Sequence, residues 1–150
     1  DKTKKIYDAY NWLTNKINAL TKKGEIKNYN TKSLQGKLHN RKDKISWKLT
    51  KKMYLKPRYI SPCHAGGLFG IITASGLVYP CEILEDKLLG DLRKNDLNFM
   101  KVWKNQETAE VKQFIKKTNC HCTYECALSY NILGNWRYQP SLVSSLFKSY

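Results

Sequence analysis

The sequence predicts an α+β fold in which a short antiparallel β-hairpin is followed by helices and preceded by an amphipathic helix. Two runs rich in apolar and β-branched residues, 68–73 and 77–81, are separated by Ala74-Ser75-Gly76 and indicate the hairpin. Apolar residues that recur every three or four positions over residues 2–22 indicate the first helix. Because no run of 18 or more apolar residues occurs, we expect no transmembrane helix and no membrane partner.

The predicted N-terminal helix has one apolar face, made of Ile6, Tyr10, Leu13, Ile17 and Leu20. Lys23-Gly24 follows the last periodic residue, and a glycine at that place is typical of a helix end. We expect the apolar face either to pack on the core of this chain or to dock a neighbour.

Between residues 24 and 60 the pattern is weaker. Polar connections are predicted at residues 28–30 and 39–44, with short helices at 31–38 and 45–54. Prolines in the segment 55–62 disfavour helix and favour extended chain. We therefore divide the chain into a basic helical lead-in or linker, residues 1–60, and a cysteine-bearing domain, residues 61–150.

After the hairpin, residues 82–92 are predicted to form a loop with Gly90 at a turn. Asp96 is the expected N-cap of a short helix that ends at Trp103. Asn105 is the expected N-cap of a second helix, residues 106–117. Side chains expected to face the core from these helices are Phe99, Val102, Trp103, Val111, Phe114 and Ile115.

The C-terminal part carries two weaker helical signals. A helix or turn is expected over residues 127–133, and Pro140 is expected to open a last amphipathic stretch.

The net charge of +15 is concentrated at the N-terminal end, because residues 1–58 contribute +13 of it. Such asymmetry can indicate an anionic partner, and it can also be a solvated lysine-rich surface. No nucleic-acid-binding motif accompanies the charge, so we do not expect a nucleic-acid partner. A zinc-stabilised basic nucleic-acid-binding module remains the alternative hypothesis, with aromatic residues for base stacking at Tyr7, Tyr10, Trp12, Tyr29 and Trp47.

The five cysteines form two groups, the pair Cys63 and Cys81 around the hairpin and the cluster Cys120, Cys122 and Cys126. The chain begins with a polar, lysine-rich stretch that lacks the apolar core of an export signal, so we expect a reducing, cytoplasmic setting. In that setting, clustered cysteines more often bind metal than form disulfides.

Hairpin pairing predicts that Cys81 lies opposite Phe69, so Cys63 reaches the same place only if its lead-in curls back. Gly66 and Gly67 permit such a curl, and their amide N–H groups would then be able to approach cluster sulfides. Two thiolates from each group complete four-cysteine ligation, which fits one [4Fe–4S] cluster or a tetrahedral zinc ion.

In the second group, Cys120 and Cys122 point apart in an extended chain, so only one of them is expected to ligate. His64 and His121 flank the candidate ligands and are possible substitutes for one of them. Burial of the cysteines as apolar side chains is the remaining alternative.

The spacing of Cys63, Gly76 and Cys81, with twelve and then four residues between them, resembles the opening signature of SPASM and twitch domains. Gly90-Asp91-Leu92, Trp103 and the Cys120–Cys126 group are also similar to that family in order and spacing. These are the auxiliary-cluster domains of radical SAM enzymes, and the resemblance covers about residues 60–135.

The resemblance implies helices arranged around a cysteine-ligated cluster, with a role in electron relay, substrate positioning or structure. A full SPASM domain has seven cysteines and two auxiliary clusters. This chain has five cysteines, so it resembles a twitch-like domain with one cluster. No Cys-x₃-Cys-x₂-Cys loop for the SAM-binding cluster precedes Cys63, so we expect this chain not to be catalytically competent alone. The implied partners are a radical SAM barrel and a peptide or small-molecule substrate.

Overall fold

The computed structural model describes residues 2–26, 32–56 and 59–147. It contains α-helices and a three-stranded antiparallel sheet, which confirms the predicted α+β class. The chain divides into two compact units. The helical unit comprises Asp1–Ile60 and Cys122–Tyr150, and the cysteine unit comprises Ser61–His121. One division between these units lies between Ile60 and Ser61, and the other between His121 and Cys122.

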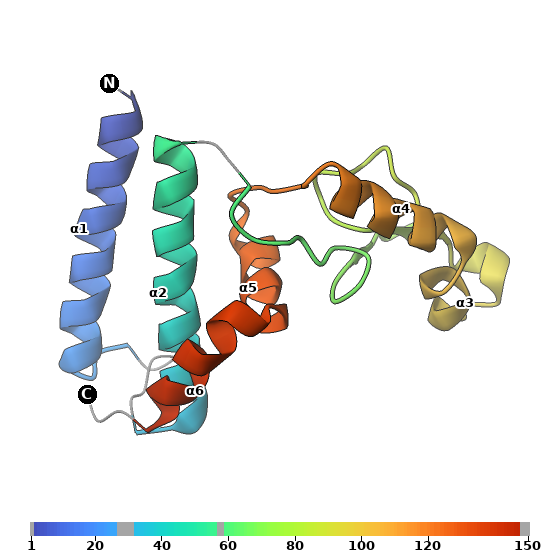
Figure 1. Cartoon of the computed structure of the whole chain (residues 1–150). Helices are drawn as coiled ribbons and strands as arrows, with labels where there is room; N and C mark the ends of the chain where they lie inside the picture. Colours follow the sequence, from blue (N-terminus) through green and yellow to red (C-terminus); the bar gives the residue numbers. More distant parts are fainter. Residues whose placement is uncertain (1, 27–31, 57–58, 148–150) are drawn as a thin grey trace. The chain divides into compact units, whose positions relative to one another are not determined.

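The helical unit begins with α1, Lys2–Lys22, as the sequence predicts. α1 and the second helix, α2, run side by side in opposite directions (Figure 1). Their interface is unusually polar. The rings of Tyr10 and Tyr54 meet at 6.4 Å, and the ammonium of Lys51 donates to the Asn11 side chain at 2.8 Å. Leu13, predicted to lie on the apolar face of α1, is 39% exposed.

The second helix, α2, is continuous from Leu34 to Leu55, so the polar connection predicted at residues 39–44 is wrong. Ser33 caps it by accepting a hydrogen bond from the Gly36 amide at 2.9 Å. No glycine or proline interrupts residues 39–44, and apolar side chains on both sides of this stretch pack against one core. Tertiary burial therefore sustains a helix whose local sequence is polar. The connection predicted at 28–30 lies outside the described residues.

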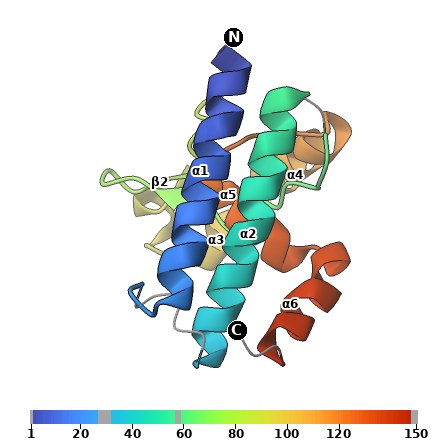
Figure 2. The same cartoon turned by 90° about the vertical axis from the view of Figure 1, so that its left-hand side faces the viewer.

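Two further helices, α5 (Glu125–Gly134) and α6 (Gln139–Leu146), contact α2 and complete the helical unit (Figure 2). The turn η3, Trp136–Tyr138, joins them. Their shared core consists of Leu49, Met53, Leu128, Ile132 and Leu142. Both helices fall where the sequence predicts them, with Pro140 in the first turn of α6.

In the cysteine unit, β1 (Ile71–Ile72) and β2 (Leu77–Tyr79) form the predicted hairpin. Ile71 pairs with Tyr79, and Ile72 with Val78. Residues 82–92 are not all loop, because β3 (Gly90–Asp91) adds a third strand on the far edge of β2. Pairing of Val78 with Gly90 satisfies backbone groups that an isolated two-stranded hairpin would leave open.

Helices α3 (Phe99–Trp103) and α4 (Gln106–Lys117) follow the sheet. Asn98, rather than the predicted Asp96, caps α3, while Asp96 has left-handed backbone and pairs with Lys101 at 2.7 Å. Asn105 caps α4 as predicted, but Phe114 is 37% exposed and not inward. The core of this unit consists of Ala65, Val78, Leu89, Val102, Val111 and Ile115.

Candidate metal centre

The lead-in to the hairpin curls back on itself, as the sequence predicts. The amides of Gly67 and Leu68 donate to the His64 carbonyl at 3.0 and 2.8 Å, which closes a tight turn. Gly66 has a φ of +71°, a left-handed conformation that other residues adopt at a cost. A Cβ atom added there would lie 3.7 Å from the Pro80 Cβ. The curl therefore places the residues after Cys63 beside the residue before Cys81.

The glycine amides of this curl are already used. The Gly66 amide donates to the Phe69 carbonyl at 2.9 Å, and the Gly67 amide donates to His64. The expectation that these two N–H groups approach cluster sulfides is therefore not met. The two glycines instead allow the backbone to form the tight turn after Cys63.

The end of α4 fixes the next cysteine with a Schellman motif. Asn119 has left-handed backbone with a φ of 50°. The Cys120 amide donates to the Ile115 carbonyl at 3.0 Å, and the Asn119 amide donates to the Lys116 carbonyl at 3.3 Å. This pattern stops the helix and turns the chain so that Cys120 packs against the core that contains Ile115.

Three of the five predicted ligands meet one core. Cys63, Cys81 and Cys120 are half-buried, and all three pack against the core of the cysteine unit. They come from the lead-in, the end of the hairpin and the end of α4, three stretches far apart in sequence. The fold thus brings all three cysteines into contact with the core of one small unit.

The other two predicted ligands belong to the helical unit. Cys122 is half-buried in the non-helical chain between α4 and α5, and Cys126 is exposed in the first turn of α5. Cys122 lies two residues from Cys120, so the chain alone keeps their Cα atoms within about 7 Å of each other.

The donor set has the chemistry of a thiolate-ligated iron–sulfur cluster. None of the five cysteines forms a disulfide, and cysteine thiolates are the usual ligands of such clusters. Within residues 2–26, 32–56 and 59–147, no three His, Cys, Asp or Glu side chains are arranged to hold a metal ion. The residue types therefore fit the cluster, and the complete ligand geometry stays a prediction.

The two histidines beside the candidate ligands differ in their surroundings. His121 is exposed, and its Nδ1 lies 2.8 Å from the Asn119 carbonyl oxygen. His64 is half-buried, and its backbone carbonyl closes the glycine curl. Neither observation tests whether a histidine replaces a cysteine as ligand.

Sequence reasoning missed two residues that position this site. Asn119 is one, and the signal for it was an asparagine two residues after Lys117, the last residue of α4, which is a common place for left-handed backbone. Ala65 is the other; it is 2% exposed and anchors the curl in the core. A single alanine inside a polar, glycine-rich stretch gave no signal of burial.

A model of a known protein family matches part of this chain. Residues 60–127 match the family model of SPASM, described as an iron-sulfur cluster-binding domain. No curated protein and no solved structure gave a match. In the part of the chain that the structure describes, no helix is both long and apolar enough to cross a membrane. The segment that spans residues 60–127, which includes all five cysteines, is therefore similar to SPASM iron–sulfur cluster-binding domains.

Proposed function

We propose that this segment binds one [4Fe–4S] cluster and serves as an auxiliary-cluster domain of a radical SAM enzyme. The observation that carries the proposal is the packing of Cys63, Cys81 and Cys120 against one core, within a segment that matches an iron–sulfur family. When bound, such a cluster supplies one-electron transfer or a rigid cross-link. The protein contributes the thiolates and a partly water-excluded setting.

The proposed ligands are Cys63, Cys81, Cys120 and Cys126. Cys120 is the choice from the Cys120–Cys122 pair because its side chain packs on the same core as Cys63 and Cys81. Cys122 is the fifth cysteine and is proposed to be dispensable. This assignment sharpens the expectation that only one member of that pair ligates.

Full thiolate ligation leaves no open iron position, so the proposed role is electron relay or structural support rather than direct substrate binding. The proposed partner is a radical SAM barrel, and the proposed substrate is a peptide or small molecule acted on by that barrel. The proposed setting is reducing and cytoplasmic, because clustered cysteines in such a compartment more often bind metal than form disulfides.

The test is anaerobic reconstitution of the full chain with iron and sulfide, followed by metal and sulfide analysis. The expected product is brown and holds about four irons and four sulfides per chain. Serine variants of Cys63, Cys81, Cys120 and Cys126 are expected to lose most of the iron. The matched control is Cys122→Ser, two residues from Cys120, which is expected to retain it.

Two results would overturn the proposal. One is colourless protein that holds a single zinc ion, which would favour the zinc-stabilised module. The other is full iron retention in the Cys63→Ser and Cys81→Ser variants together. Equal losses in Cys120→Ser and Cys122→Ser would leave the cluster in place and refute only the choice between them.

A further inference from the structure

A pocket of about 340 Å³ lies in the helical unit between α2, Ile60 and the η3–α6 segment. Volumes of this size are at the lower end of those that hold small-molecule ligands. Its lining residues are Arg41, Lys44, Ile45, Lys48, Leu49, Lys52, Ile60, Arg137, Tyr138 and Ser141. Every one of them belongs to the helical unit.

The wall of the pocket that α2 provides is strongly cationic. Four of its basic residues, Arg41, Lys44, Lys48 and Lys52, are spaced three or four positions apart and so share one face of the helix. Arg137 adds a fifth positive charge from η3. Among the described residues that line the pocket there is no Asp or Glu, so the lining carries no acidic side chain to balance these charges.

Burial and the neighbouring positive charges both act on the pKa of Lys44. Burial lowers the pKa of the Lys44 ammonium, and the nearby cations Arg41 and Lys22 lower it further. A bound anion would relieve this repulsion. The charge arrangement therefore favours a negatively charged occupant.

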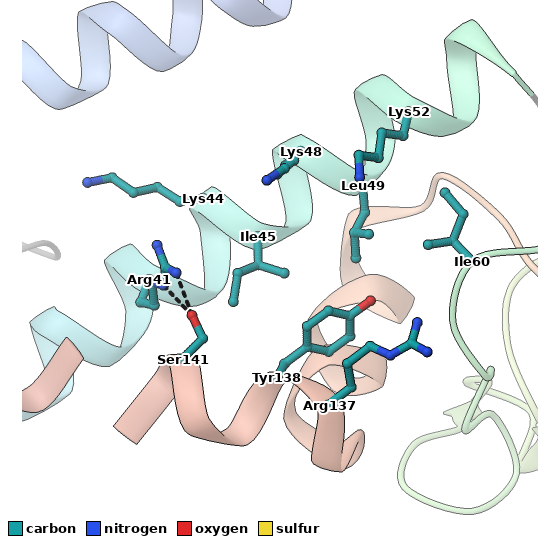
Figure 3. Close-up of a pocket in the computed structure, with 10 residues that line it drawn as sticks. All are labelled: Arg41, Lys44, Ile45, Lys48, Leu49, Lys52, Ile60, Arg137, Tyr138 and Ser141. Atoms are coloured by element: carbon teal, nitrogen blue, oxygen red, sulfur yellow. Dashed lines mark hydrogen bonds between the residues drawn. The ribbon is translucent and has the colours of Figure 1, made fainter. Parts of the chain in front are cut away.

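Arg41 is held in place at one end of the pocket. Its Nε donates a hydrogen bond to the Ser141 hydroxyl at 2.7 Å, and a terminal nitrogen donates to the same oxygen (Figure 3). A guanidinium has five N–H donors, so this contact leaves others for an anion. The ion pairs found among the described residues join Lys42 to Asp43, Lys87 to Asp86 and Lys101 to Asp96, so none of them uses a side chain that lines this pocket.

The pocket also has apolar lining residues, which alternate along α2 with the basic ones. Ile45 and Leu49 project from α2 toward the ring of Tyr138, and Ile60 lies at one end (Figure 3). These side chains suit a flat or apolar body rather than a fully hydrated ion. An occupant that contacts both the basic and the apolar side chains therefore combines an anionic group with an apolar or aromatic part.

We propose that this pocket binds a small organic anion that carries a phosphate or carboxylate group on an aromatic or apolar body. The anionic group lies against Arg41, Lys44 and Lys48, and the body lies against Tyr138 and Leu49. The proposal does not rest on the iron–sulfur assignment, because its residues and its measurement are separate from the cysteines.

The test is isothermal titration of the full chain with four probes at constant low ionic strength. AMP offers a phosphate on a planar body, isophthalate offers two carboxylates on a ring, inorganic phosphate offers charge alone, and adenosine offers the body alone. AMP or isophthalate is expected to bind at least about tenfold more tightly than inorganic phosphate, and adenosine is expected not to bind. Tighter binding of AMP identifies the phosphate class, and tighter binding of isophthalate identifies the carboxylate class.

The variant that tests the site is Lys44→Gln with Lys48→Gln, expected to weaken binding about tenfold or more. The matched control is Lys5→Gln with Lys16→Gln, which removes the same charge from exposed positions on α1 and is expected to leave affinity unchanged. Helical circular dichroism checks that both variants fold.

Three outcomes would overturn the proposal. The first is no heat with AMP or isophthalate at millimolar concentration. The second is an equal loss of affinity in the two double variants, which would indicate a diffuse charge effect. The third is binding only to long single- or double-stranded nucleic acid, with a steep dependence on salt, which would assign the charge to a nucleic-acid surface.

Discussion

The side chain of Asn105 joins the start of α4 to the backbone of Leu89, the residue before β3. Its amide nitrogen donates to the Leu89 carbonyl at 2.7 Å, and its side-chain oxygen accepts from the Thr108 amide at 2.8 Å. Leu89 is completely buried, so its carbonyl would otherwise lack water as a partner. One residue thus caps a helix and ties that helix to the sheet.

Replacement of Asn105 by alanine is expected to lower the free energy of unfolding by about 2 kcal/mol, about half from the lost cap and half from the lost bond to Leu89. Asn98→Ala is the matched control, since Asn98 caps α3 at an exposed site through its bonds to Met100 and Lys101. It is expected to cost about 1 kcal/mol. Urea unfolding measures both, and equal losses would contradict the bridging role of Asn105.

Gly70 is required by close packing. A Cβ atom at Gly70 would lie 2.8 Å from the Trp103 ring and 2.9 Å from the Tyr79 carbonyl oxygen. Gly70→Ala is therefore expected to destabilise the chain by about 1–3 kcal/mol and to disturb the ring stack of Phe99 on Trp103, whose centroids are 4.9 Å apart. Thermal unfolding and tryptophan fluorescence measure these effects.

The control for that substitution is Gly67→Ala, where the nearest atom to an added Cβ, the His64 carbonyl oxygen, is 3.4 Å away. Gly67 is not among the glycines with positive φ. The expected cost is well below that of Gly70→Ala. A Gly67→Ala variant as unstable as Gly70→Ala would show that the curl, rather than the tryptophan contact, limits stability.

Where the signals are local, the sequence predicts the fold well. Asn105 and the basic Lys116-Lys117 mark the two ends of α4, and both ends fall where predicted. Gly76 sets the turn between β1 and β2, and the observed pairing of Ile71 with Tyr79 follows from it. Caps and turns are read within a few residues, so these elements need no knowledge of distant contacts.

The elements that the sequence does not predict depend on contacts with residues that are distant in sequence. β3 is only two residues long, and its pairing with β2 is not visible in its own composition. The polar sequence of residues 39–44 predicts a break in α2, although Leu38 and Ile45 pack on the core that α5 and α6 provide. With a break there, the sequence does not predict the basic wall of the pocket, because Arg41 and Lys48 share a face only in one continuous helix.

For the candidate site, the sequence predicted the five cysteines as ligands and a resemblance to the SPASM family, but not which cysteines pack on one core. Placement of Cys120 on the core of Cys63 and Cys81 depends on the left-handed Asn119 and the Schellman bond to Ile115. The proposed choice of Cys120 over Cys122 as ligand depends on this packing.

Lys44 is expected to be an unfavourable charge in the folded chain. Because its folded pKa is lowered, the protonated side chain costs stability at neutral pH, and this cost fades as pH rises through the folded pKa. Lys44→Gln is therefore expected to raise the free energy of unfolding by about 0.5 kcal/mol at pH 7 after solvent screening. Urea unfolding at low salt measures the gain.

The exposed Lys16→Gln is the control for Lys44→Gln and is expected to leave stability unchanged. The gain at Lys44 should shrink in high salt, where repulsion from Arg41 and Lys22 is screened. Loss of stability in Lys44→Gln would mean that the lysine stem, rather than its charge, dominates the contribution of this residue.

Tyr10 is expected to make the helical unit sensitive to alkaline pH. Burial raises its pKa above 10.0, and the negative charges of Glu125 and of ionised Tyr54 raise it further. The folded pKa then exceeds the unfolded one, so the stabilising contribution is complete below pH 10 and is lost as pH rises through the folded pKa. Tyr10→Phe is expected to lose less stability than the natural chain between pH 9 and pH 11.

Urea unfolding at pH 9 and pH 11 measures this difference, with Tyr124→Phe as the control at an exposed tyrosine of the same unit. The lysines titrate in both variants and cancel in the comparison. Glu125→Gln removes one cause of the shift, so it is expected to reproduce part of the effect of Tyr10→Phe while leaving the tyrosine in place. If Tyr10→Phe and Tyr124→Phe follow the same pH profile, the ionisation of Tyr10 is not linked to the packing of α1 on α2.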